Sequence, residues 1–78
     1  MNAYESNKRI ADNIKTIIRK KGILQSDLAQ IAGYSRQQLN NMLQGRKLIR
    51  ADDIPRIADA LSLTPNDLYN YQNSQNGR

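Results

Sequence analysis

The residues best placed to do chemistry form a run of amide side chains in the middle of the chain. Residues 36–44 read Arg-Gln-Gln-Leu-Asn-Asn-Met-Leu-Gln, and no carboxylate interrupts the run. An amide presents a hydrogen-bond donor and an acceptor side by side, which matches N6 and N7 of adenine in the major groove, and arginine matches O6 and N7 of guanine. The side chains of this run therefore favour hydrogen-bond recognition of nucleic-acid bases.

The composition argues against catalysis and against a bound metal. The chain has no cysteine and no histidine, so disulfides, Cys/His zinc sites and nucleophiles activated by histidine cannot form. The pair Asp52-Asp53 could be imagined as two catalytic carboxylates, but capping of a following helix explains both residues better. We expect no enzyme activity, no cofactor, no metal and no small-molecule ligand.

The amide run requires a short amphipathic helix to position it. On a helical wheel of about 100° per residue, Leu39, Met42 and Leu43 share one side. The other side carries Gln37, Asn41 and Gln44, flanked by Gln38 and Asn40, with Arg36 at the N-terminal rim. Glutamate and lysine would form a better solvated helix surface than amides do, so a recognition surface is favoured over a neutral solvent-exposed face.

A second short helix precedes the amide helix and meets it across a tight turn. Apolar residues recur at helical spacing within residues 25–32. Gly33 can adopt the positive φ that often ends a helix. Ser35 then caps the next helix, and Gln38 completes a capping box. The stretch is predicted to be a helix-turn-helix.

Three further helices complete the predicted fold. Apolar spacing places them over about residues 7–21, 52–61 and 65–71, the last opened by Thr64 as its N-cap. Leu24 leaves the helix over 25–32 without a side-chain cap, at a cost of about 1 kcal/mol. In the linker before the fourth helix, either Leu48 or Ile49 is expected to point inward.

The length permits one small domain at most. We expect a flexible arm over residues 1–6, the helical domain over residues 7–71, and a disordered polar tail over residues 72–78. The chain has no apolar run of about 20 residues, and its first residues lack the apolar centre of a signal peptide. No membrane association is predicted, and a cytoplasmic location is expected.

Positive charge is concentrated in the part of the chain that holds the amide run. Residues 1–50 carry ten basic and three acidic residues, whereas residues 51–78 carry two basic and four acidic residues. A basic N-terminal portion suits a polyanion such as nucleic acid. Charge alone is equally consistent with ordinary solvated helix faces.

A spaced motif carries a resemblance to a known family. Gln25, Leu28-Ala29, Ala32-Gly33, Ser35, Leu39 and Gly45 stand at spacings that resemble the lambda-repressor-like family, which includes phage repressor, Cro and XRE-type DNA-binding domains. The resemblance covers roughly residues 8–71. It implies an all-α fold of five helices with the helix-turn-helix at the second and third. Many relatives have a glycine where this chain has Ser62.

The resemblance also implies a function. The chain would be a sequence-specific double-stranded DNA-binding transcriptional regulator, most simply a repressor of the Cro or XRE type, encoded by a bacterium or phage and associated with the nucleoid. Residues that would reach base edges are Arg36, Gln37, Gln38 and Asn41. Residues that would contact the DNA backbone are Gln25, Ser35, Asn40, Gln44, Arg46 and Lys47. In relatives, the residue matching Gln25 often also braces the first side chain of the recognition helix.

A partner chain is expected, and one alternative function stays open. Relatives bind palindromic operators as dimers, with half-sites about 34 Å apart, so we expect a homodimer formed through the last helix and the acidic C-terminal portion. The alternative is a protein-interaction adaptor, antitoxin-like or anti-repressor, on the same fold. Its apolar patch would consist of Leu63, Leu68, Tyr69 and Tyr71, residues that could equally close the core.

Overall fold

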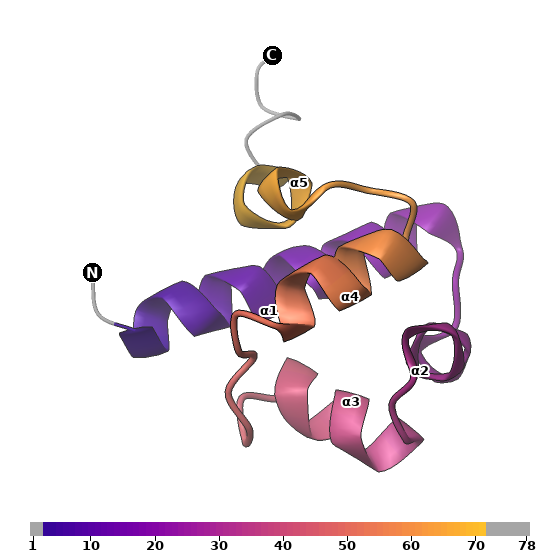
Figure 1. Cartoon of the computed structure of the whole chain (residues 1–78), viewed down its shortest axis with the longest axis horizontal. Helices are drawn as coiled ribbons and strands as arrows, with labels where there is room; N and C mark the ends of the chain where they lie inside the picture. Colours follow the sequence, from indigo (N-terminus) through magenta and orange to yellow (C-terminus); the bar gives the residue numbers. More distant parts are fainter. Residues whose placement is uncertain (1–2, 72–78) are drawn as a thin grey trace.

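Over residues 3–71, the fold consists of one long N-terminal helix and four short helices. The computed structural model describes residues 3–71. In this part of the chain the elements are α1 (Ala3–Lys21), α2 (Gln25–Ala32), α3 (Arg36–Leu43), α4 (Asp53–Ala60) and α5 (Pro65–Asn70), with no strand. Helices α2 and α3 lie on one side of α1 and α5 lies on the other (Figure 1), and α4 packs against α2 and α5. The predicted all-α, five-helix class is confirmed.

The core forms from the apolar faces that the helical spacing predicted. Fully buried side chains come from every helix, and they include Ile14, Ile17, Leu28, Leu39, Met42, Leu43, Ile57 and Leu68. Burial of each large aliphatic side chain contributes about 1.5–3 kcal/mol. Because these contributions come from all five helices, the helices are held as one unit around α1.

Helix α1 begins earlier than expected. The predicted flexible arm over residues 1–6 is wrong for residues 3–6, which form the first turn of α1. Residues 1–2 and the expected tail over 72–78 lie outside the described residues. Glu5 in this turn complements the helix dipole. Asn7 anchors the turn, since its Nδ2 donates to the Ile49 carbonyl (2.9 Å) and its Oδ1 accepts from the Ile49 N–H (3.2 Å). Ile49 is accordingly the buried residue of the linker, and Leu48 is exposed.

The start of α4 differs from the predicted cap. Asp52 occupies the N-cap position but makes no side-chain capping hydrogen bond. The carboxylate of Asp53 instead accepts from the Arg50 N–H (2.9 Å) and from the Tyr34 hydroxyl (2.6 Å). One residue of the acidic pair therefore fixes the helix start, through a contact with the α2–α3 turn that sequence spacing does not reveal.

Helix α5 has the predicted N-terminal cap, and it also closes the core. Thr64 and Asp67 form the reciprocal capping box, and Pro65 stands in the first turn. Leu68 is fully buried, Leu63 and Tyr71 pack against the core, and only Tyr69 of the proposed adaptor patch is substantially exposed, at 46%. The patch is thus mainly core. None of the helices within residues 3–71 is long and apolar enough to cross a membrane.

Candidate nucleic-acid interface

The turn between α2 and α3 is fixed by local hydrogen bonds. Gly33 has φ of +86°, and the Tyr34 N–H donates to the Ala29 carbonyl at 2.8 Å. Ser35 Oγ then accepts from the Gln38 N–H (3.0 Å), while Gln38 Oε1 accepts from the Ser35 N–H (2.7 Å). The predicted helix-turn-helix and its capping box are both present, and they set the direction in which α3 leaves the turn.

The side chain of Arg56, in α4, hydrogen-bonds to the backbone of this turn. Arg56 Nε donates to the Ala32 carbonyl (2.9 Å) and Nη2 donates to the Gly33 carbonyl (3.3 Å). The guanidinium also lies over the Tyr34 ring, 4.5 Å from its centroid, a favourable cation–π position. The φ of Gly33 is what favours glycine here, and a Cβ at this position would also lie 3.0 Å from Arg56 Nη2, so the guanidinium would have to shift slightly.

Tyr34 links the turn to α4 through a hydrogen bond to Asp53. Burial, together with this hydrogen bond and the nearby carboxylate, raises the pKa of Tyr34 to about 12. Burial alone would raise the pKa of Asp53, but the hydrogen bonds from the Tyr34 hydroxyl and the Arg50 N–H lower it below its ordinary 3.8. At neutral pH the phenol therefore donates to a carboxylate, which is the stronger arrangement of the two groups.

The outward face of α3 is a surface of amides. Arg36, Gln37, Gln38 and Gln44 are exposed, and Asn40 and Asn41 are half-buried. Gln37 Nε2 donates to Asn41 Oδ1 at 3.1 Å, and Arg46 Nη1 reaches the same oxygen at 3.5 Å. Oε1 of Gln38 is likewise occupied, by the Ser35 N–H of the capping box. Because the hydrogen bonds among these exposed side chains can exchange for others, the face still offers amide donors and acceptors to a ligand.

An open hollow of about 580 Å³ separates the N-terminal ends of α2 and α3. It is lined by Leu24, Gln25, Ser26, Arg36, Gln37 and Asn40. Gln25 Nε2 donates to Asn40 Oδ1 at 3.3 Å, so Gln25 braces a residue one turn into α3. Leu24 supplies no side-chain cap, as expected, and the N-terminus of α2 borders the hollow with its positive dipole end, which favours an anion there.

Two cations follow α3 in a loop that is held against the helix end. The N–H groups of Arg46 and Lys47 both donate to the Asn41 carbonyl, at 2.9 and 3.2 Å. Gly45 has φ of +83°, which permits the sharp exit from the helix. The two side chains are exposed. They extend the positive charge from Arg36 at one end of α3 to the loop at the other.

Comparison with known proteins identifies the family to which this helix-turn-helix belongs. A model of the Cro/C1-type helix-turn-helix DNA-binding domain matches residues 13–74. The chain belongs to the Cro/C1-type helix-turn-helix DNA-binding family. It is accordingly a DNA-binding transcriptional regulator, and the resemblance inferred from the spaced motif is confirmed.

Solved structures show the same fold. The clp gene regulator ClgR from C. glutamicum is 18% identical, with 92% of this chain and 95% of that chain covered and a TM-score of 0.77. The restriction-modification controller protein C.AhdI from Aeromonas hydrophila is 22% identical, with 87% and 99% covered and a TM-score of 0.78. A sequence comparison with curated proteins found no match.

Within this Cro/C1-type fold, nine of the ten predicted site residues belong to α3, the turn before it or the loop after it, and Gln25, at the start of α2, contacts α3 through Asn40. Sequence reasoning missed Arg56, Tyr34 and Asp53, which support this region from α4 and the turn. An arginine on the solvent side of an amphipathic helix carries no local signal of such a role. The contacts of the ten residues with DNA remain predictions.

Proposed function

We propose that the chain is a sequence-specific repressor of the Cro type that reads double-stranded DNA in the major groove with α3. The observation that carries this proposal is the exposed amide face of α3, which has no carboxylate and has a cation at each end. Such a face offers paired donors and acceptors to bases. It also meets phosphates without electrostatic repulsion.

Specificity and affinity are assigned to different residues. Arg36, Gln37, Gln38 and Asn41 contact base edges, with Gln38 limited to its amide N–H groups because its oxygen caps the helix. The backbone-contacting residues are Gln25, Ser35, Asn40, Gln44, Arg46 and Lys47. Base contacts set the sequence preference, while phosphate contacts set the register and most of the affinity.

The proposed assembly is a homodimer on a palindromic operator. One domain of this size reads only a few base pairs. A dimer on two half-sites about one helical turn, or 34 Å, apart reads twice as many. Helix α5 lies on the side of α1 away from α3 (Figure 1). Its exposed Tyr69 can therefore meet a second copy without obstructing DNA. A protein that stays monomeric both free and on DNA would contradict this assembly.

The test of the proposed function is selection from a randomised duplex library at two salt concentrations. A sequence-specific dimer enriches a palindromic motif that persists at the higher salt. Binding without an enriched motif, and with a steep loss of affinity in salt, would mean that charge alone drives association. The proposed setting is the cytoplasm of a bacterium, where the nucleoid supplies the DNA.

A further inference from the structure

A second groove, with both polar and apolar walls, lies beside the outward face of α3, between α1 and the C-terminal end of α3. Its volume is about 120 Å³. Helix α1 contributes Lys8, Asp12 and Lys15 to its walls, and the end of α3 with the loop contributes Gln44, Gly45 and Leu48. Gln44 belongs to both surfaces, so the groove continues the outward face of α3.

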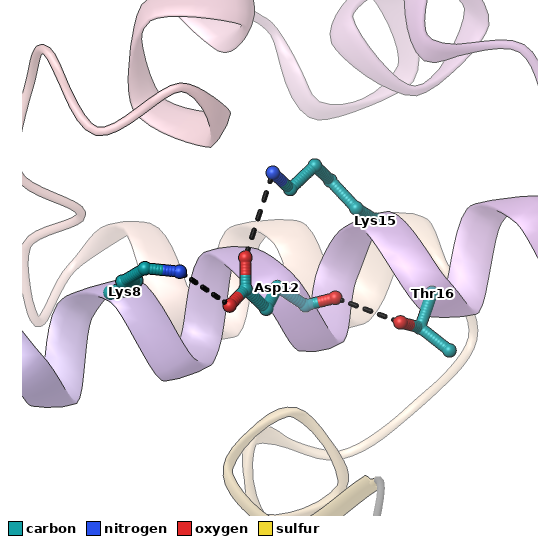
Figure 2. Close-up of polar contacts among 4 residues, drawn as sticks. All are labelled: Lys8, Asp12, Lys15 and Thr16. Carbon is teal, nitrogen blue, oxygen red and sulfur yellow. Dashed lines mark hydrogen bonds and ion pairs between the residues drawn. The ribbon is translucent and has the colours of Figure 1, made fainter.

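Two ammonium groups meet at one carboxylate in this groove. Lys8 Nζ lies 3.0 Å from Asp12 Oδ2, and Lys15 Nζ lies 3.5 Å from Asp12 Oδ1 (Figure 2). The Asp12 carbonyl additionally accepts from Thr16 Oγ1 at 3.0 Å. The cluster carries a net positive charge because two cations share one anion.

These ion pairs contribute little to the stability of the fold. The Lys8 side chain is 72% exposed, and both pairs lie within a single helix. Exposed pairs of this kind contribute little to folding, because water screens them and the side chains lose rotamer freedom. The lysines can therefore exchange the carboxylate for another anion at small cost to the fold.

We propose that this groove binds one phosphate of the DNA backbone, with Lys8 and Lys15 as its ligands and Asp12 as the anion that the phosphate displaces. The inference rests on the proposed function, because the strand that passes the C-terminal end of α3 supplies the phosphate. In the free protein Asp12 holds the two ammonium groups together. In the complex its charge weakens binding uniformly on all sequences, which moderates non-specific affinity while leaving base readout unchanged.

The direct test compares the salt dependence of DNA binding in the wild-type protein and in a Lys8→Gln/Lys15→Gln double variant. Loss of one phosphate contact lowers the slope of log K against log salt by about 0.9. The selected motif should stay unchanged. The matched control is Lys20→Gln, because Lys20 is exposed on the same helix but lies two turns after Asn13, whose side chain faces α5. The control should retain the wild-type slope.

The Asp12→Asn variant provides a second test, in which the affinity for DNA should increase. Removal of one negative charge near a phosphate should raise the affinity about threefold at low salt on every sequence. A double variant with the wild-type slope, a Lys20→Gln control with an equal loss of slope, or an Asp12→Asn variant that binds no more tightly would overturn the phosphate site alone. A wild-type protein that binds no DNA would overturn both this site and the proposed function.

Discussion

The asparagines of α1 and those of α3 perform different tasks with the same side chain. Asn13 is 1% exposed, and its Nδ2 donates to the carbonyls of Leu68 (2.6 Å) and Tyr69 (3.3 Å) in α5. Asn40 and Asn41 accept instead from other side chains, those of Gln25 and Gln37. The α1 asparagines thus join backbone segments that are distant in sequence, while the α3 asparagines join only neighbours on the surface.

The energetic consequence follows from burial of the partner. A buried carbonyl that loses its donor costs about 1–3 kcal/mol, because no water replaces the hydrogen bond. A half-exposed amide pair can exchange its hydrogen bond for one to water or to a base at little net cost. The first arrangement stabilises the fold, and the second keeps donors and acceptors available for a ligand.

The largest expected effect is on stability, from Asn13→Ala. The substitution leaves the Leu68 carbonyl without its donor and opens a small cavity, so the free energy of unfolding should fall by about 2–3 kcal/mol. Urea unfolding followed by circular dichroism measures the change. Asn41→Ala is the matched control, and it should stay within about 0.5 kcal/mol of the wild type. The contrast between α1 and α3 is lost if the control is the more destabilised protein.

A smaller effect, of about 1 kcal/mol at neutral pH, is expected from Tyr34→Phe, which removes the hydrogen bond to Asp53. The pKa of Tyr34 is raised from 10.0 to about 12 in the fold. Its contribution is therefore complete below pH 10 and disappears as the pH rises to 12. The pKa of Asp53 is lowered from 3.8, so its contribution is complete above pH 3.8 and declines at more acidic pH.

Thermal unfolding of wild-type and Tyr34→Phe proteins at a series of pH values tests this coupling. The two proteins should differ at neutral pH and converge between pH 10 and 12. A difference that stays constant across that interval would show that Tyr34 stabilises the turn by packing alone. Since Tyr34 joins the helix-turn-helix to α4, this measurement reports how firmly the recognition surface is held to the rest of the fold.

The smallest expected effect is a gain in stability from Ser62→Gly. Ser62 has φ of +60°, a left-handed conformation that costs a residue with a Cβ about 1–2 kcal/mol. Glycine removes that cost but loses more entropy on folding, so the net gain should be about 0.5–1 kcal/mol. The melting temperature measures the gain. Gly33→Ala is the converse variant and should destabilise the protein. A loss of stability in Ser62→Gly would refute strain at this position.

Features encoded within a few residues were predicted from the sequence. The bounds of α2, the start of α3 and the caps at Ser35 and Thr64 follow from local spacing and local hydrogen bonds. The outward amide face was predicted from the helical wheel. In a short helix the positions of the buried apolar residues determine which positions face the solvent.

Features that depend on distant partners were not predicted. Asn13 bonds to a carbonyl 55 residues away, and Arg56 to one 24 residues away, so neither role has a local signature. The cap assigned to Asp52 was wrong for the same reason, since Tyr34 and Arg50 engage the neighbouring Asp53. Helix α1 begins at Ala3, before its apolar repeat, and the bond from Asn7 to the Ile49 carbonyl, 42 residues away, was likewise not predicted.

The central claim is that exposed side chains of α3 choose the DNA sequence. The most direct measurement repeats the library selection with Gln37→Ala protein beside the wild type. The account predicts the loss of preference at one or two base pairs of each half-site, with discrimination there reduced by about 1–3 kcal/mol and the rest of the motif intact. An identical motif in both selections, or an equal loss of affinity on all sequences, would contradict it.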